Sequence, residues 1–229
     1  SLHGKVVRQY QHHYREASPV SGDKECLYWI RFLPYHMAKA NMSQVFKSTS
    51  GEKLTEIQAH DDEVLCCAFS PDDHLIATCS SDRKVKVWNI QQGKLLRVFE
   101  DEHEEQVNHC EFTNTARRLL LATCSNDTCL NVKIWNLNKP SSQNTMFGHF
   151  KPVNHCCFSP DDSYLSTSSN DGTVKVSAAN EWKTIDVKTF FSESDDEEVL
   201  VKCSTWTADG TRIICAARNA ALVRINAGK

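Results

Sequence analysis

A segment of similar pattern recurs four times along this chain, and this repeat constrains the fold more than any other feature. Val64, Val107, Val153 and Val201 open equivalent segments that are roughly 43 to 48 residues apart. Each copy contains short runs of alternating or β-branched residues, separated by turn sequences such as 71–73, Pro-Asp-Asp. A period of this length, with up to four strands in each copy, predicts the blades of a β-propeller.

The first copy shows the expected strands most clearly. Four runs, Val64–Phe69, Leu75–Ser80, Val85–Ile90 and Leu95–Phe99, predict four short antiparallel strands. The second copy predicts strands at 107–112 and 119–124. The third predicts strands at 153–158 and 164–168 and an outer strand near Lys183–Val187, and the fourth predicts three strands within Val199–Ile225.

Four polar residue types also recur at fixed places within the copies. In the first copy they are His60, Thr78, Asp82 and Trp88. These side chains can form one chain of hydrogen bonds: the turn carboxylate bonds the imidazole, the imidazole bonds a strand hydroxyl, and the hydroxyl accepts from the indole N–H. Such a chain would satisfy every buried polar group and join three strands. The second copy has His103, Thr123, Asp127 and Trp135; the third has His149, Thr167 and Asp171 with Ser177 in place of tryptophan; the fourth has Cys215, Asn219 and Ile225 at the last three positions.

These sets resemble the hydrogen-bond chain inside each blade of WD40 propellers. A hydroxyl, a histidine and an aspartate also form the catalytic triad of hydrolases. Because the set returns at the same place in successive copies, we interpret it as scaffold. The sequence shows no phosphate-binding loop, no metal-ligand spacing and no non-repeating nucleophile beside a base. We therefore predict no catalytic residues and a non-enzymatic protein-interaction module.

Charge and hydropathy exclude several other classes. The net charge of the 229 residues is −3, so the basic excess typical of nucleic-acid binding is missing. We find no apolar stretch of transmembrane length, and the first residues contain no apolar core of a secretion signal. We predict a cytoplasmic protein that binds neither nucleic acid nor membrane.

Eleven cysteines are many for a chain of this size, but they are not spaced as zinc-binding pairs. Without a secretion signal, reduced thiols that pack as small hydrophobic side chains are the better interpretation than disulfides. The run at 155–157, His-Cys-Cys, suggests metal binding, yet alternate strand residues face opposite sides. We predict no metal site. First strands hold Cys66, Cys67, Cys110, Cys156, Cys157 and Cys203; second strands hold Cys79, Cys124 and Cys215.

Residues 1–42 lie outside the repeat. Leu27, Ile30, Leu33 and Met37 fall at helical spacing, and Pro34 interrupts them, which predicts a kinked helix or two short ones. Residues 44–57 then align with the third and fourth strands of a blade, so half a blade follows a helix directly. We interpret this junction as a deletion, arising from a splice product, a truncated gene model or an engineered join.

The predicted fold class is therefore all-β: an incomplete WD40 propeller, with about four blades represented, after a short N-terminal helical segment. Closed propellers cover their blade faces, so an open series needs further blades or another chain. The expected divisions are 1–42 for the helical segment and 43–229 for the partial propeller, with a half blade at 43–57, repeats at about 58–99, 100–146 and 147–191, and an incomplete repeat at 192–229.

Acidic loops lead into three of the four copies. The loop at 150–152, Phe-Lys-Pro, is the exception. Each cluster alone is most simply a solvated loop, but three on one face favour docking of a basic partner. The third cluster spans 193–198. The predicted partner-binding residues are Asp61, Asp62, Glu63, Asp101, Glu102, Glu104 and Glu105.

Longer stretches resemble one family within the WD40 proteins. Gly51–Phe69, Asn144–Phe158 and Val201–Asp209 are similar to the first WD40 propeller of the apoptotic protease-activating factors, the apoptosome scaffolds. Cys26–Ala40 is similar to the helical segment that precedes the propellers in that family. The matches occur in the family's order.

The resemblance implies a cytosolic apoptosis regulator that senses cytochrome c, a strongly basic protein, and controls procaspase activation. Intact members bind ADP or ATP in a module that has no counterpart in this sequence, so we expect no cofactor here. Cytochrome c and the intact family scaffold are the expected partners. The alternatives are a general WD40 adaptor for another basic protein, and a truncated isoform that is inactive or interferes with the scaffold.

Overall fold

The computed structural model describes residues 44–46, 53–56, 59–100, 103–127, 131–139, 141–190, 199–217 and 221–224. Within these ranges the backbone forms seventeen β-strands and one short 3₁₀-helix, Ala116–Arg118. The all-β prediction is confirmed for this part of the chain. The helical segment predicted at 1–42 lies outside the described residues. No helix among the described residues is both long and apolar enough to cross a membrane.

Four antiparallel sheets follow one another along the sequence, and each is a simple meander. They are preceded by a two-stranded hairpin, β1 (Gln44–Phe46) with β2 (Lys53–Glu56), where the half blade was predicted. The first blade comprises β3 (Val64–Phe69), β4 (Leu75–Ser80), β5 (Val85–Asn89) and β6 (Lys94–Phe99); the second blade comprises β7 (Val107–Phe112), β8 (Leu120–Ser125), β9 (Val132–Asn136) and β10 (Ser142–Met146); the third blade comprises β11 (Val153–Phe158), β12 (Tyr164–Ser169), β13 (Thr173–Ala178) and β14 (Lys183–Thr189); the fourth blade comprises β15 (Cys203–Trp206), β16 (Arg212–Ala216) and β17 (Ala221–Arg224).

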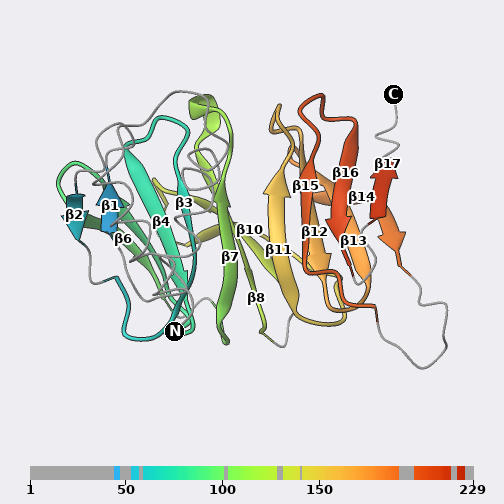
Figure 1. Cartoon of the computed structure of the whole chain (residues 1–229), viewed down its shortest axis with the longest axis horizontal. Helices are drawn as coiled ribbons and strands as arrows, with labels where there is room; N and C mark the ends of the chain where they lie inside the picture. Colours follow the sequence, from blue (N-terminus) through green and yellow to red (C-terminus); the bar gives the residue numbers. More distant parts are fainter. Residues whose placement is uncertain are drawn as a thin grey trace, which may run out of the picture.

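The first strands of the blades lie side by side in chain order. Strand β3 packs beside β7, β7 beside β11, and β11 beside β15. In Figure 1 the hairpin lies at the left end of this series and the fourth blade at the right end. The described sheets thus form an open series of blades, as the count of copies predicted.

Hydrophobic side chains fill the spaces between consecutive blades. The Phe99 ring lies 4.3 Å from the ring of Trp135 on the next blade, centroid to centroid. Full burial of one large apolar side chain contributes about 1.5–3 kcal/mol, so these interfaces hold the series together. The interface of the first and second blades buries Ala77, Cys79, Val85, Val87, Phe99, Val107, Cys110, Phe112, Leu121 and Trp135.

Two asparagines that sequence reasoning did not single out also bridge blades. The Asn108 side-chain amide donates to the Val153 carbonyl at 2.7 Å, from the second blade to the third. Asn154 donates in the same way to the Val201 carbonyl at 2.8 Å, from the third blade to the fourth. The shared sequence Val-Asn-His-Cys at 107–110 and 153–156 was the available sign of this role.

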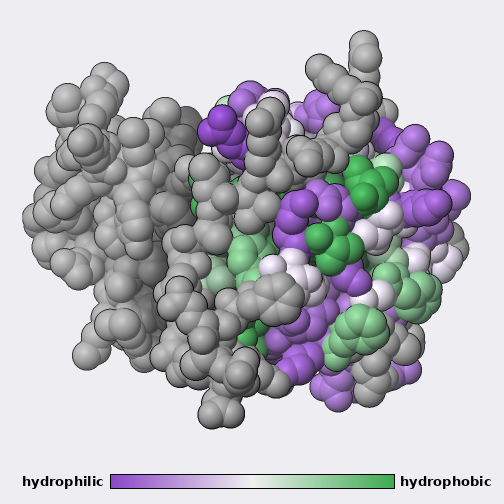
Figure 2. All heavy atoms as spheres, turned by 90° about the vertical axis from the view of Figure 1, so that its right-hand side faces the viewer, coloured by the Kyte–Doolittle hydropathy of each residue, from purple (hydrophilic) through white to green (hydrophobic). Residues whose placement is uncertain are grey.

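The fourth blade departs from two expectations. Its first strand begins at Cys203 rather than near Val201, because the Val201 amide bonds the Ser169 carbonyl of the third blade instead of joining the ladder. Cys203 is exposed and not packed as a small hydrophobic residue, so that prediction is wrong at this position. Alternate residues of β15 and β16 are exposed, Ile214 among them. Figure 2 views this end and shows hydrophobic surface interspersed with hydrophilic surface.

Candidate docking face and the polar networks beneath it

The loop that enters the first blade carries two exposed carboxylates, those of Asp61 and Asp62. The Asp61 amide donates to the Asp82 carboxylate at 3.3 Å, and the Glu63 amide donates to Asp62 at 2.7 Å. Glu63 itself is half-buried. The backbone of this loop is therefore tied down by hydrogen bonds while two of its acidic groups face solvent.

The loop that enters the second blade carries Glu104 and Glu105, both exposed. The Ser125 hydroxyl donates to the carbonyl of Glu105 at 3.1 Å and to that of Gln106 at 2.9 Å. Asp101 and Glu102, which were predicted to share this face, lie outside the described residues. So does the acidic cluster at 193–198.

The two loops lie at the same end of neighbouring strands. Each loop precedes the first strand of its blade, and β3 and β7 pack side by side. Lysines lie close to this acidic region: Lys84 pairs with Glu100 at 3.4 Å, and Lys86 donates to the Ala59 carbonyl at 2.6 Å. The structure thus brings five of the predicted partner-binding residues, Asp61, Asp62, Glu63, Glu104 and Glu105, to one end of the molecule.

The corresponding loop of the third blade is aromatic and basic. Phe150 is 83% exposed and Phe147 is 67% exposed. The Lys175 ammonium lies 5.6 Å from the centroid of the Phe150 ring and hydrogen-bonds the Gly148 carbonyl. The sequence analysis did not identify Phe147. The only sequence signal for its exposure was its position next to a glycine, Gly148, which is typical of a loop.

Beneath the acidic loop of the first blade, the predicted polar set forms a continuous chain of hydrogen bonds. His60 Nδ1 lies 2.8 Å from the Asp82 carboxylate, and His60 Nε2 lies 2.8 Å from Thr78 Oγ1. The Trp88 indole N–H donates to the same threonine oxygen at 3.1 Å. The loop, the second strand and the third strand are thereby linked.

The second blade repeats this arrangement in a more buried setting. His103 lies 3.1 Å from the Asp127 carboxylate and 2.9 Å from Thr123 Oγ1. The Trp135 indole N–H donates to Thr123 Oγ1 at 2.8 Å. All four side chains are buried.

In the third blade the histidine, threonine and aspartate meet, but the tryptophan position is different. His149 lies 2.9 Å from the Asp171 carboxylate and 2.8 Å from Thr167 Oγ1. Ser177 lies 3.4 Å from the Thr184 hydroxyl on the outer strand. In the fourth copy Cys215 is buried, and Asn219 and Ile225 lie outside the described residues.

Electrostatics support a structural role for these sets. Burial lowers the pKa of His60 more than its hydrogen bond to Asp82 raises it, so the imidazole is neutral at pH 7. Burial opposes ionisation of Asp82, but hydrogen bonds from the Lys84 amide and His60 lower its pKa. An ionised carboxylate only accepts, so His60 Nδ1 carries the proton and Thr78 donates to Nε2. The Thr78 hydroxyl is buried and fully engaged, which suits a scaffold rather than a nucleophile.

The run at 155–157 contributes to the packing of blades. The His155 ring lies 3.9 Å from the His109 ring of the second blade, centroid to centroid, and the Cys156 sulfur lies 3.7 Å from His109 Nδ1. A different group of cysteines, Cys66, Cys79 and Cys110, converges between the first and second blades. Sequence spacing did not reveal this group, because its members come from three strands of two blades.

Two family models match different parts of the chain. A family model described as the APAF-1 helical domain matches residues 1–54. A second model, the WD domain or G-beta repeat, matches residues 51–89 and 140–176. The helical-domain match thus extends over β1 and into the first two residues of β2.

Individual relatives point to the same family. Apoptotic protease-activating factor 1 of Danio rerio is 69% identical over 184 residues, which are 79% of this chain and 15% of the relative. The protein of the same name from Rattus norvegicus is 57% identical over 370 aligned residues, covering 97% of this chain and 30% of the relative. Nuclear distribution protein nudF 1 of Talaromyces marneffei is 31% identical over 121 residues, which are 52% of this chain and 26% of that protein.

The chain spans less than a third of the length of either apoptotic relative. The alignment with the rat protein is longer than the 229 residues of this chain, so it contains residues of the relative that have no counterpart here. Both relatives share more than half of their aligned residues with it, and the blades carry the WD40 hydrogen-bond sets described above. The chain therefore belongs to the apoptotic protease-activating factor family, and its repeats are WD40 repeats.

Proposed function

We propose that the acidic end of the first and second blades docks a basic protein, and that this partner is cytochrome c. The observation that carries the proposal is the placement of two acidic loops at the same end of the neighbouring strands β3 and β7. Their exposed carboxylates belong to Asp61, Asp62, Glu104 and Glu105.

The geometry of these loops favours electrostatic recognition. Their backbones are held by hydrogen bonds to Asp82 and Ser125, so little ordering is required when a partner binds. Carboxylates that converge on one end attract a lysine-rich protein, speed its approach and discriminate against acidic proteins.

Aromatic side chains beside this region supply a second kind of contact. Phe147 and Phe150 lie on the loop that enters the third blade, the next blade in the series. Exposed aromatic residues that become desolvated on binding often provide much of the affinity of an interface. We propose that the partner contacts these rings at the edge of the acidic region.

The role of the docking face follows from its family. We propose that in the cytosol the intact scaffold senses cytochrome c through this region and thereby controls procaspase activation, and that this chain binds no nucleotide cofactor itself. The cysteines that pack within the blades support a reducing compartment. The interpretation of the junction between residues 1–42 and the half blade at 43–57 as a deletion is supported by the additional residues in the rat alignment.

Calorimetric titration of the purified chain with cytochrome c tests the partner. We expect binding that weakens at least tenfold when the salt concentration rises from about 50 to about 200 mM, because exposed charges are screened. The double variant Asp61→Lys/Asp62→Lys is expected to weaken binding at low salt by at least a further tenfold.

The matched control is Asp73→Lys/Glu181→Lys. Both residues are exposed on turns at the opposite ends of the strands, and both double variants change the net charge equally. Equal affinities of the two double variants, or binding that does not depend on salt, would contradict the proposed face. Binding of another basic protein but not of cytochrome c would instead favour the general WD40 adaptor.

A further inference from the structure

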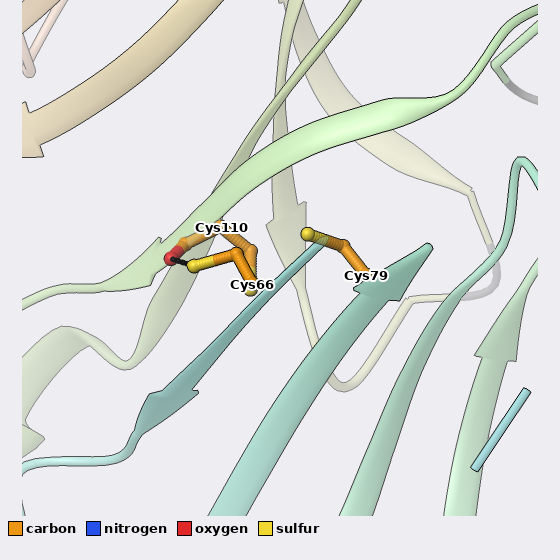
Figure 3. A group of neighbouring side chains, drawn as sticks. All are labelled: Cys66, Cys79 and Cys110. Atoms are coloured by element: carbon orange, nitrogen blue, oxygen red, sulfur yellow. Dashed lines mark hydrogen bonds between the residues drawn. The ribbon is translucent and has the colours of Figure 1, made fainter. Parts of the chain in front are cut away.

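Three cysteine side chains from two blades meet at one point in the structure. Cys66 lies on β3, Cys79 on β4 and Cys110 on β7, and their sulfur atoms all lie within 4.8 Å of one another. Figure 3 shows the three side chains converging from these separate strands. They form the thiol cluster discussed below, which no part of the docking proposal uses.

The surroundings of the thiol cluster are enclosed. Cys79 and Cys110 are buried, and Cys66 is half-buried. The Cys66 thiol donates to the Cys110 carbonyl at 3.7 Å, the contact marked in Figure 3, and the Cys110 thiol donates to the Ala77 carbonyl at 4.0 Å. In both contacts the thiol is the donor, and hydrogen bonds from a thiol are weak, so their loss on metal binding would cost little.

The donor set consists of the three thiols. His109 directly precedes Cys110 on β7, but its ring nitrogens are not among the ligand atoms that lie within 4.8 Å of one another. Its Nδ1 lies 3.7 Å from the Cys156 sulfur of the third blade instead. Three thiolates suit zinc, which would take its fourth ligand from solvent, or cuprous copper.

We propose that Cys66, Cys79 and Cys110 bind a thiophilic metal ion between the first and second blades. Zinc–sulfur bonds of about 2.3 Å place tetrahedral ligand sulfurs about 3.8 Å apart. The sulfurs, within 4.8 Å of one another, need to approach by at most about 1 Å, which small side-chain rotations provide. Soft thiolate donors select zinc or cuprous copper over magnesium or calcium.

Such an ion would join β3 and β4 of one blade to β7 of the next. Metal that binds the folded but not the unfolded chain stabilises the fold, and here it would stabilise one blade interface in an open series. Ligands at positions 66, 79 and 110 follow no short zinc motif, so only the packing of the blades brings them together.

Zinc titration of the reduced, metal-free full chain against a chromophoric chelator tests the site. We expect one equivalent to bind, and we expect Cys79→Ala to weaken its affinity by more than about 100-fold, since loss of even an outer partner of a metal ligand costs 10–100-fold. Cys215→Ala is the matched control: Cys215 is a buried cysteine on β16, the second strand of the fourth blade, as Cys79 is on β4 of the first. It should leave the affinity unchanged.

A second measurement on the unmodified chain does not depend on how the variants fold. Cysteine alkylation followed by mass spectrometry should slow at least tenfold at Cys66, Cys79 and Cys110 together when zinc is added, and should stay constant at the exposed Cys203. The same titration with cuprous copper distinguishes the ions, and tight one-to-one binding of either ion to these thiols supports the site.

Absence of stoichiometric binding of both ions would overturn the proposal. Binding that Cys79→Ala leaves intact, with no protection of the three thiols, would also overturn it. Formation of a disulfide within the thiol cluster on mild oxidation, without any metal binding, would assign it a redox role instead.

Discussion

The second and third blades are built on the same polar set but complete it in different ways. In the second blade Thr123 lies between His103 and the indole of Trp135. In the third blade the tryptophan is replaced by Ser177, and a different hydroxyl joins the set. Thr173 donates to the Asp171 carboxylate at 2.6 Å and lies 3.2 Å from His149 Nδ1.

The difference shows that the network has two separable halves. One half, from threonine to tryptophan, links the second and third strands inside the hydrophobic interface. The other half, from histidine to aspartate, ties the entry loop to a turn. The third blade lacks the first half and reinforces the second, since Asp171 also accepts from the Phe150 amide at 3.0 Å. The loop that carries the exposed Phe150 is therefore held even though the indole is missing.

The largest expected effect comes from the tryptophan itself. Trp135 is fully buried between the first and second blades, and Trp135→Ala should lower the free energy of unfolding by about 3–5 kcal/mol. Chemical denaturation at 25 °C measures this change. Trp182→Ala, at a half-buried turn of the third blade, is the control and should cost much less. Similar losses for both variants would show that the Trp135 indole contributes no more to stability than a half-buried indole on a turn.

The two threonines distinguish the halves more sharply. Thr123→Val leaves His103 Nε2 and the Trp135 indole N–H without a partner, whereas Thr167→Val leaves only His149 Nε2. At about 1–2 kcal/mol for each unsatisfied buried group, we expect losses of about 2–4 and about 1–2 kcal/mol in the free energy of unfolding. Denaturant titrations of both variants decide this, and equal losses would argue against the divided network.

The reinforcing hydroxyl of the third blade should have a smaller effect. Thr173→Val removes its hydrogen bonds to Asp171 and His149 at a half-buried site, and we expect a loss of about 1 kcal/mol. The melting temperature of the variant measures it. Thr184→Val, which removes only the long contact to Ser177, serves for comparison. A larger loss in Thr184→Val would show that Thr173 does not reinforce the histidine–aspartate half of the network.

The smallest expected effect concerns acid stability. Burial opposes ionisation of Asp171, but hydrogen bonds from His149, Thr173 and the Phe150 amide outweigh it and hold the pKa well below its usual range. Because the folded-state pKa is depressed, the stabilisation is present above the unfolded pKa of about 3.9 and is lost as the pH falls toward the folded value.

Asp171→Asn should therefore remove part of the fall in melting temperature between pH 5 and about pH 3, by a few degrees. Asp82→Asn, whose carboxylate lacks a partner equivalent to Thr173, should remove less. Thermal melts at both pH values measure the difference. An acid dependence that is the same in both variants would contradict the reinforcement of the third blade.

Local chemistry made most strands predictable. The predicted run Val64–Phe69 coincides with β3, and Leu75–Ser80 coincides with β4, because alternation and turn residues act over only a few positions. The start of the fourth blade was misplaced, since the Val201 amide bonds the neighbouring blade. The prediction that Cys203 is packed inside was also wrong, because alternation marks the two faces of a strand but does not show which face another blade covers.

The candidate site divides in the same way. The acidic loops were identified from composition at strand entries, and the structure places the described ones on neighbouring strands. The bridges made by Asn108 and Asn154 depend on contacts between residues more than forty positions apart. Such contacts leave no regular spacing in a single sequence.

By itself, the sequence determined the repeat, the hairpins and the polar set within each blade, because these depend on turns and on the two-residue period of a strand. Only the tertiary structure decided what lies between blades. The exposed end of the fourth blade and the convergence of Cys66, Cys79 and Cys110 both follow from how sheets pack. The packing of one blade on the next is a long-range interaction, and it places side chains together whatever their separation in the chain.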